Sequence, residues 1–245
     1  METSLSAGTL PSPPVGVSPK PWGIPAIIFV LVIPAGLLLP NLFVKVPEHL
    51  STADIIAALV STLVLKDVLF IGMAAGFAIW RYKLGWDALG LRPFDRTIWW
   101  VPLVAAAGAL ALVMAYSALL VLIAGDGAAP KQEDLDRILN NNATLPLAAF
   151  SVVIAAPLSE EIFFRGFIFG GLIRPLGVTG AMIASGLLFG AFHVTGLDSL
   201  AIVPPFAVVG AFFAWLYYRT GSIYPCIAAH LLFNIVGFTG AVLAN

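Results

Sequence analysis

The chain has 245 residues, of which 60% are hydrophobic and only 10% are charged, with a formal net charge of -1. Soluble domains carry roughly 45–50% apolar and 25% charged residues, so this composition excludes an ordinary soluble protein. It also offers no basic surface for nucleic acid, and we expect no nucleic-acid partner. The single cysteine, Cys226, excludes an intramolecular disulfide and a cysteine-based metal cluster.

Taken in order, the chain begins with residues 1–21, which are rich in Pro, Ser and Gly and predict a flexible tail. Apolar runs of about 20 residues then recur, each long enough to cross a hydrocarbon core of about 30 Å. We therefore predict an all-α fold, a polytopic integral membrane bundle of about seven transmembrane helices, with a range of roughly six to eight. The predicted spans are residues 22–44, 53–80, 98–124, 145–173, 178–195, 200–218 and 223–242.

The spans divide into two parts. Residues 22–144 are expected to be accessory helices with two long polar connections, of which residues 125–144 form a surface helix or loop; residues 145–243 are expected to be the catalytic core. Most basic loop residues fall on one side of this arrangement, which predicts a cytoplasmic amino terminus in a multi-pass protein of the cell membrane. They are Lys20, Arg81, Lys83, Arg92, Arg96, Arg174 and Arg219, against Lys45, Lys131 and Arg137 on the other side.

A cluster of charged residues interrupts the apolar segment at residues 145–173. Glu160, Glu161 and Arg165 lie within residues 145–173, where no other charge occurs. An ionised side chain at the bilayer centre costs about 2.5–3.5 kcal/mol on insertion scales, so such groups normally face a protein interior and have a partner. Since Glu161 and Arg165 are four residues apart, they share a helix face and are expected to form an ion pair. Glu160 points about 100° away and is left for another partner.

Two later spans carry further polar groups, His193 in one and His230 with Asn234 in the last. The turn at residues 174–177 joins antiparallel helices, and Glu160 and His193 both lie about 22 Å from it at 1.5 Å per residue. His230 lies some 15 Å from the same membrane face. We therefore expect all three side chains in one buried pocket, with Phe189, one turn before His193, as part of its wall.

This set of groups favours water-mediated hydrolysis. A carboxylate or imidazole can take a proton from water as general base. An imidazole N–H and the Asn234 amide can stabilise an oxyanion on the scissile carbonyl. Alternatively, Glu160, His193 and His230 are the ligand types of a catalytic zinc ion with an open position. The residues alone leave both chemistries open, so the cofactor is either none or zinc.

Three motifs carry a family resemblance. Residues 160–165 read EExxxR, residues 189–193 read FxxxH and residues 230–234 read HxxxN. In that order and spacing, the chain resembles the CPBP (CAAX protease and bacteriocin-processing, ABI) intramembrane proteases, which include type II CAAX prenyl proteases and immunity proteins. The resemblance covers about residues 145–240, with weaker similarity at residues 86–92.

The resemblance implies an intramembrane endopeptidase that cuts a membrane-associated protein or lipidated peptide, such as a prenylated CAAX-type substrate. It implies that Glu160 and His193 activate the attacking water and that His230 and Asn234 bind the oxyanion. Glu161 and Arg165 would be a supporting pair. We favour the metal-free version, because the amide of Asn234 is a natural oxyanion donor and a poor zinc ligand.

Two other functions remain open. Buried Glu, His and Lys can serve as a proton or ion relay in a transporter, although no inverted repeat is apparent in the sequence. A non-catalytic membrane chaperone or immunity protein of the same family is the other alternative. Lys66 and Asp67 also lie in mid-span, and neighbouring helix positions do not face each other. Each is therefore expected to find a partner on another helix or in a water-filled cavity.

Overall fold

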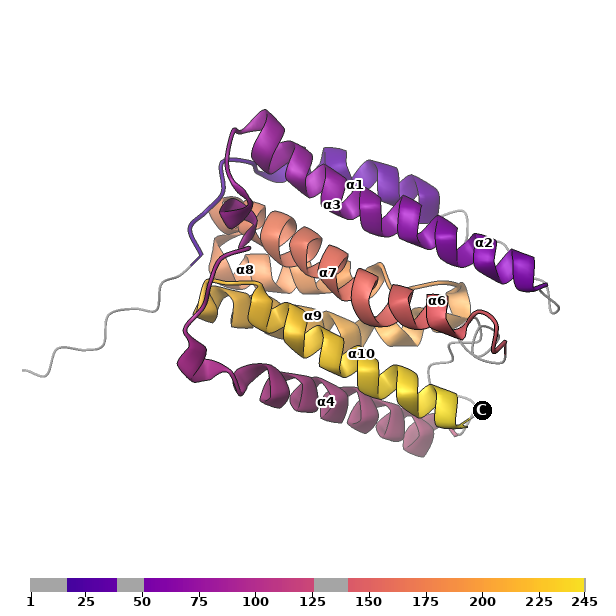
Figure 1. Cartoon of the computed structure of the whole chain (residues 1–245). Helices are drawn as coiled ribbons and strands as arrows, with labels where there is room; N and C mark the ends of the chain where they lie inside the picture. Colours follow the sequence, from indigo (N-terminus) through magenta and orange to yellow (C-terminus); the bar gives the residue numbers. More distant parts are fainter. Residues whose placement is uncertain (1–16, 39–50, 126–140, 245) are drawn as a thin grey trace, which may run out of the picture.

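The computed structural model describes residues 17–38, 51–125 and 141–244, and these residues form helices and connecting loops without a strand (Figure 1). The helices are α1 (Ile24–Leu38), α2 (Thr52–Thr62), η2 (Leu63–Val68), α3 (Leu69–Ala75), η3 (Gly76–Arg81), η4 (Trp86–Leu89), η5 (Arg96–Ile98), α4 (Val101–Ala124), α6 (Leu145–Ala149), η7 (Phe150–Ala155), α7 (Ala156–Glu160), η8 (Glu161–Phe169), α8 (Gly170–Ala191), η9 (Leu197–Ile202), α9 (Val203–Thr220) and α10 (Tyr224–Ala244). The predicted all-α class is confirmed.

Several of these segments join into long rods. Five continuous helices are long and apolar enough to cross a membrane: Thr52–Arg81, Arg96–Ala124, Leu145–Ala191, Ser199–Thr220 and Tyr224–Ala244. The third of them reverses at Gly177, whose φ of 69° and ψ of 173° are not helical, and so supplies two passes. Together with the shorter apolar helix α1, the described residues agree with about seven spans. The predicted turn between the two passes is confirmed.

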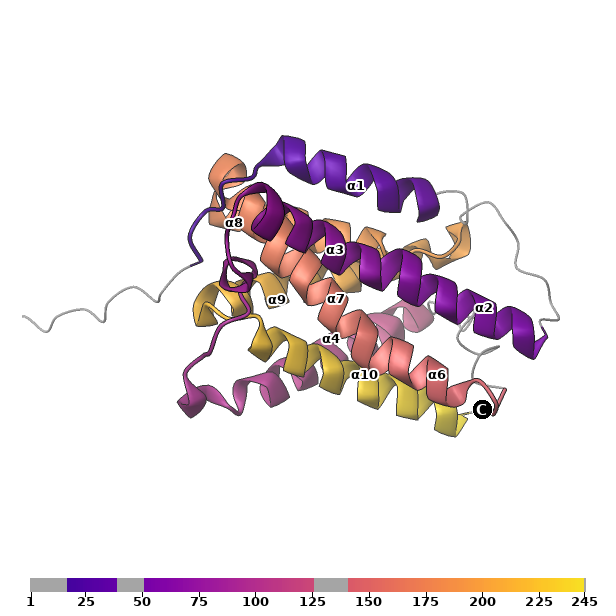
Figure 2. The ribbon, with the colours of Figure 1, turned by 45° about the horizontal axis from the view of Figure 1, so that its top comes forward.

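The hairpin on either side of Gly177 lies at the centre of the bundle (Figure 2). The α1 and α2–α3 rods cover one side of it, and α10 and α4 lie on the other. The most apolar window of Leu145–Ala191 is 56% buried, compared with 11% for the Arg96–Ala124 rod. Glu160, which is predicted to be catalytic, and the predicted supporting pair Glu161 and Arg165 are therefore carried by the most enclosed rod in the bundle.

The second arm of this hairpin packs tightly on α9. A Cβ atom added at Gly186 would lie 2.4 Å from the backbone oxygen of Ala207, and one at Gly190 would lie 2.6 Å from that of Val203. These two glycines stand four residues apart on one face, so α9 can approach the backbone of α8 directly. This close approach brings Phe206 of α9 beside the end of α8.

The flexible tail predicted for residues 1–21 extends too far. Residues 1–16 lie outside the described part of the chain, but Val17 and Lys20 are buried against the bundle. The backbone N–H of Lys20 donates to the Gly170 carbonyl at 3.2 Å. The Trp22 indole donates to the Phe167 carbonyl at 2.9 Å and stacks on the Phe167 ring. The apolar and aromatic side chains at the end of the Pro-rich stretch therefore anchor it to the hairpin.

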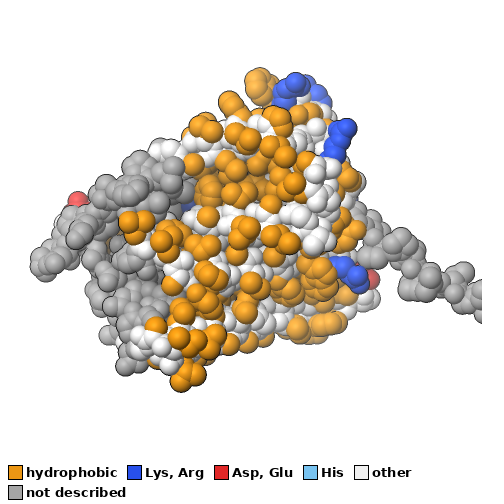
Figure 3. Space-filling model, turned by 180° about the vertical axis from the view of Figure 1, so that it is seen from behind, with side chains coloured by type: hydrophobic (Ala, Val, Ile, Leu, Met, Phe, Trp, Pro, Cys, Tyr) orange, Lys and Arg blue, Asp and Glu red, His pale blue; other side chains and the backbone are white. Residues whose placement is uncertain are grey.

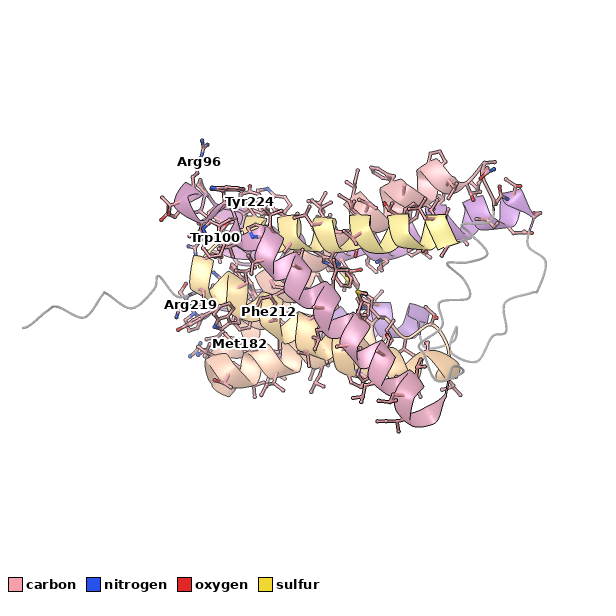
Figure 4. All side chains as sticks on the ribbon, turned by 90° about the horizontal axis from the view of Figure 1, so that it is seen from below. Arg96, Trp100, Met182, Phe212, Arg219 and Tyr224 are labelled. Atoms are coloured by element: carbon pink, nitrogen blue, oxygen red, sulfur yellow. The ribbon has the colours of Figure 1, made fainter. Side chains whose placement is uncertain are left out.

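Basic residues gather at the end of the bundle where the hairpin turns. Figure 3 shows blue side chains at one edge of an otherwise hydrophobic surface. In Figure 4, Arg96 and Arg219 lie at the same end as Trp100 and Tyr224, as expected for an interfacial belt. At this end the Arg92 guanidinium donates to the Gly221 carbonyl, and burial together with Arg92 lowers the pKa of Lys20.

Two other sequence predictions fall on undescribed residues. The last part of the first span (residues 39–44) and most of the polar connection at residues 125–144 lie outside the described residues. Lys45, Lys131 and Arg137, the basic residues of the opposite side, lie there too. The cytoplasmic position of the amino terminus therefore stays a prediction.

Candidate active site

The two motif glutamates lie where the long rod changes its winding. Glu160 ends α7, and Glu161 begins the π-helical segment η8. A π-helical turn inserts residues into a helix and changes which side chains share a face, and such turns occur often at functional sites. Both glutamates are buried in the bundle, as the sequence predicted from their cost in lipid.

Three side chains from other helices surround the Glu160 carboxylate. The Lys66 Nζ atom lies 2.8 Å from Glu160 Oε1. The Nε2 atom of His193 lies 3.7 Å from Glu160 Oε2, and that of His230 lies 3.9 Å from the same oxygen. The structure therefore brings the side chains of Glu160, His193 and His230 together. Glu160 Oε2 itself is buried and has no hydrogen-bond partner among the described residues.

Both imidazoles are held by their other nitrogen. His193 Nδ1 lies 2.7 Å from the Phe189 carbonyl oxygen, and His230 Nδ1 lies 2.8 Å from Glu161 Oε1. Carbonyl and carboxylate oxygens only accept, so Nδ1 carries the hydrogen in both rings. Each Nε2 atom is thereby turned toward Glu160, with its own hydrogen-bonding capacity left for a third group.

Glu161 belongs to a buried chain of charges. Arg165 Nη1 lies 3.0 Å from Glu161 Oε1, so the predicted ion pair is present. The same Glu161 oxygen also accepts from His230, which the sequence did not predict. The Arg165 guanidinium lies over the rings of Phe189 and Phe213, at 4.4 and 5.3 Å from their centroids. Arg165, Glu161 and His230 thus form one connected series.

Aromatic rings form the apolar wall of the site. Phe189 lies 4.5 Å from the His193 ring, centroid to centroid, as predicted for a wall residue. Phe206 of α9 lies 4.6 Å from the same ring and was missed. Its signal in the sequence is weak, because an isolated Phe in an apolar span has no distinguishing spacing. Both rings therefore pack directly against the His193 imidazole.

Asn234 lies on α10 one turn after His230, and its Nδ2 atom donates to the Val152 carbonyl of η7 at 2.7 Å. This bond uses one of its two amide hydrogens. The predicted oxyanion contact of Asn234 therefore stays a prediction, to be made by the second hydrogen.

A zinc ion fits this arrangement poorly. Among the described residues, no group of three or more His, Cys, Asp and Glu is placed to hold a metal ion. The Lys66 ammonium, 2.8 Å from Glu160, already balances that carboxylate and would repel a dication at the same position. Zinc bound by Glu160, His193 and His230 is therefore not part of the proposed reaction.

Glu160 and the three side chains around its carboxylate differ in their exposure. The side chains of His193 and Lys66 are 24% and 23% exposed, whereas those of Glu160 and His230 are 6% and 5% exposed. His193 lies just beyond the end of α8, where the chain leaves the helix. A substrate would therefore reach the Glu160 carboxylate past His193 and Lys66.

Comparison with known proteins agrees with these motifs. A family model described as type II CAAX prenyl endopeptidase Rce1-like matches residues 142–236. Both matches support the resemblance of this region to the CPBP intramembrane proteases. The "Putative membrane peptidase YdiL" of Bacillus subtilis (strain 168) is 34% identical over 108 residues, which are 44% of this chain. Those residues are 43% of the relative, so the chain spans less than half the length of the curated relative it matches. No solved structure matches.

The CPBP match contains every predicted site residue but not Lys66, the closest partner of Glu160. The sequence did mark Lys66 and Asp67 as mid-span charges in need of partners, and the expected partner on another helix is found. The statement that these neighbours do not face each other was wrong, because Lys66 Nζ approaches Asp67 Oδ1 to 3.5 Å. Both lie in the π-helical segment η2, and the lysine stem is long enough to bend toward its neighbour.

Proposed function

We propose that this protein is an intramembrane endopeptidase that activates water at Glu160. The observation that carries the proposal is the buried, unpaired Oε2 atom of Glu160, which is faced by Nε2 of His193 at 3.7 Å and of His230 at 3.9 Å. Glu160 Oε2 and an unprotonated Nε2 of His193 can accept the two hydrogens of one water molecule, while a protonated His230 keeps an N–H at Nε2 to donate. The family described for residues 142–236 supports the same class of reaction.

In the proposed reaction, the water oxygen bonds to the scissile carbonyl carbon while one water proton moves to Glu160 or His193. The carbonyl oxygen becomes an oxyanion, stabilised by the His230 imidazolium and by the second hydrogen of the Asn234 amide. Glu161 orients the ring, because its Oε1 atom accepts from His230 Nδ1 at 2.8 Å. The C–N bond then breaks, and the proton held by Glu160 or His193 passes to the leaving nitrogen. No net proton is lost in the cycle.

The proposed substrate is a membrane-associated protein cut close to the bilayer. A site carried by transmembrane helices receives only chains that are themselves inserted or lipid-anchored. The family description names CAAX prenyl endopeptidases, which makes a prenylated carboxyl-terminal peptide the first substrate to test. A matched peptide without the prenyl group tests whether the lipid is recognised.

The first prediction concerns Glu160. In detergent or proteoliposomes, Glu160→Gln is expected to lower kcat for peptide hydrolysis by about 10²–10⁴-fold, because the amide cannot accept the water proton. Hydrolysis is measured by mass spectrometry of the peptide products. The matched control is Asp95→Asn, which removes an exposed carboxylate in the loop before α4 and should leave hydrolysis unchanged.

Two results would contradict the proposal. Full activity of Glu160→Gln would remove the carboxylate from the mechanism. A wild-type protein that is folded and inert toward all membrane peptides would favour the non-catalytic chaperone or immunity protein. A chelator added to the active wild type is expected to change nothing. Loss of activity that zinc restores would instead assign the metal role to Glu160, His193 and His230.

A further inference from the structure

We propose that Lys66 is a positioning residue that selects which oxygen of Glu160 acts on water. This inference rests on the proposed function and extends it to a residue outside the matched region at 142–236. The Lys66 ammonium lies 2.8 Å from Oε1 of Glu160, whereas Oε2 is left without a hydrogen bond and faces both histidines. The two carboxylate oxygens thus have different tasks.

The glutamate side chain cannot make this distinction alone. Its last torsion joins an sp³ carbon to the carboxylate and is broad, so neither oxygen is preferred by the stem itself. A cation fixed beside one oxygen removes that freedom. It holds the carboxylate plane in the orientation in which the second oxygen points at His193 and His230.

The lysine has a second carboxylate beside it. Asp67 Oδ1 lies 3.5 Å from Lys66 Nζ and accepts from the Ser159 hydroxyl at 2.6 Å. Ser159 immediately precedes Glu160 on α7. Lys66 and Asp67, which are neighbours on η2, therefore contact two neighbouring residues of the same turn of α7. Both Asp67 and Ser159 are buried. This arrangement restrains the long lysine stem, which otherwise has many rotamers to lose.

A purely structural role predicts a different outcome. An ion pair that only ties the Thr52–Arg81 rod to α7 would lower stability when lost, and any drop in activity would follow the fraction of folded protein. A positioning role predicts that folded protein loses kcat, that KM stays constant, and that a cation restored at the same place restores kcat. A misplacement of about 1 Å at reacting groups can cost on the order of 10²-fold in rate.

The chain offers a clean way to restore the cation, because Cys226 is its only cysteine. In a Cys226→Ser background, Lys66→Cys removes the ammonium. Alkylation with 2-bromoethylamine then converts the new thiol into an aminoethyl thioether, a close copy of lysine. Alkylation with iodoacetamide adds a neutral group of similar size and is the matched control. Intact-mass spectrometry reports the extent of each modification, and peptide hydrolysis reports kcat and KM.

We expect Lys66→Cys to lower kcat by about 10–100-fold at unchanged KM, and the aminoethyl form to recover to within a few-fold of the background protein. The iodoacetamide form should stay slow. Full activity of Lys66→Cys, or a fully aminoethylated protein that stays as slow as the neutral form, would overturn the inference.

Lys66→Arg and Lys66→Met supply the second comparison, made on protein that elutes as a single folded species. The arginine variant keeps the cation and should be the faster of the two; equal rates would overturn the inference. If the background protein itself hydrolyses nothing, the proposed function has failed, and the role of Lys66 fails with it. An active background protein with an indifferent Lys66 removes only the role of Lys66.

Discussion

At the scale of single residues, one oxygen of Glu161 joins two other polar side chains of the site. Its Oε1 atom is 3.0 Å from Arg165 Nη1 and 2.8 Å from His230 Nδ1. One carboxylate thus connects the interior cation to a proposed catalytic imidazole. Burial of this series is complete at Glu161 and Arg165, whose side chains are fully enclosed. Substitution of Arg165 or Glu161 is therefore expected to change the position of the His230 ring.

Substituting Arg165 alone should lower the stability of the protein more than substituting both Arg165 and Glu161. In Arg165→Met the Glu161 carboxylate remains buried with only His230 beside it, and loss of one partner of a buried pair costs about 3–5 kcal/mol. Adding Glu161→Gln removes the stranded charge, so the double variant should unfold at a higher temperature than Arg165→Met. Thermal unfolding in detergent, followed by intrinsic fluorescence, gives the midpoints of the wild type, Arg165→Met, Glu161→Gln and the double variant.

Additive losses in this cycle would show that the two side chains do not interact. The sum of the two single effects should therefore exceed the double effect clearly. Activity gives an independent reading, because both single variants disturb the orientation of His230. The double variant regains stability without regaining hydrolysis.

At the scale of elements, the central hairpin depends on the close approach of α8 and α9. Gly186→Ala places a methyl group 2.4 Å from the Ala207 carbonyl oxygen, and backbone cannot move aside as a flexible side chain can. Overpacking of this kind costs about 1–3 kcal/mol. We expect a lower unfolding midpoint and slower hydrolysis, since α9 carries Phe206 against His193.

Gly108→Ala is the matched control for this prediction. Gly108 lies inside α4, and a Cβ added there meets nothing within 4 Å. Alanine is favoured over glycine in a helix interior by up to about 1 kcal/mol, so this variant should be equal to the wild type or more stable. Equal midpoints for Gly186→Ala and Gly108→Ala would mean that the α8–α9 contact contributes nothing measurable.

The elements also show what sequence can and cannot predict. The hairpin at Gly177 and the meeting of Glu160 with His193 follow from residue counts, because both arms rise by nearly the same length per residue. The contact of Lys66 with Glu160 does not follow, since 94 residues separate them and no motif joins their helices. The second partner of Glu161 was missed for a similar reason. Four-residue spacing identifies neighbours on one helix and gives no information on which face meets another helix.

At the scale of the whole molecule, the distribution of basic residues predicts the orientation of the protein in the membrane. Of the seven basic residues on one side of the predicted topology, Arg96 and Arg219 lie at the same end of the bundle (Figure 4), and Figure 3 shows Lys and Arg side chains gathered at one edge. The distribution predicts that this end faces the cytoplasm. The loops of the other end lie partly outside the described residues. Labelling of intact cells can show which end of the bundle faces outward.

In the Cys226→Ser background, Thr97→Cys and Asn142→Cys place exposed thiols at opposite ends of the bundle. A membrane-impermeant maleimide added to intact cells should label the second and not the first. Permeabilised cells should label both, which shows that each thiol is reactive. The reversed pattern would place the basic end outside and overturn the predicted orientation.

The hairpin turn at Gly177 is followed by a helix that ends at Ala191, some 14 residues later. At 1.5 Å per residue that arm is about 21 Å long, shorter than a hydrocarbon core of about 30 Å. In the predicted orientation, the Glu160 carboxylate and its two histidines would lie toward the leaflet remote from the basic residues, roughly 9 Å from its surface. For the proposed peptidase, this depth predicts that only a peptide that unwinds within that leaflet presents its backbone to the site.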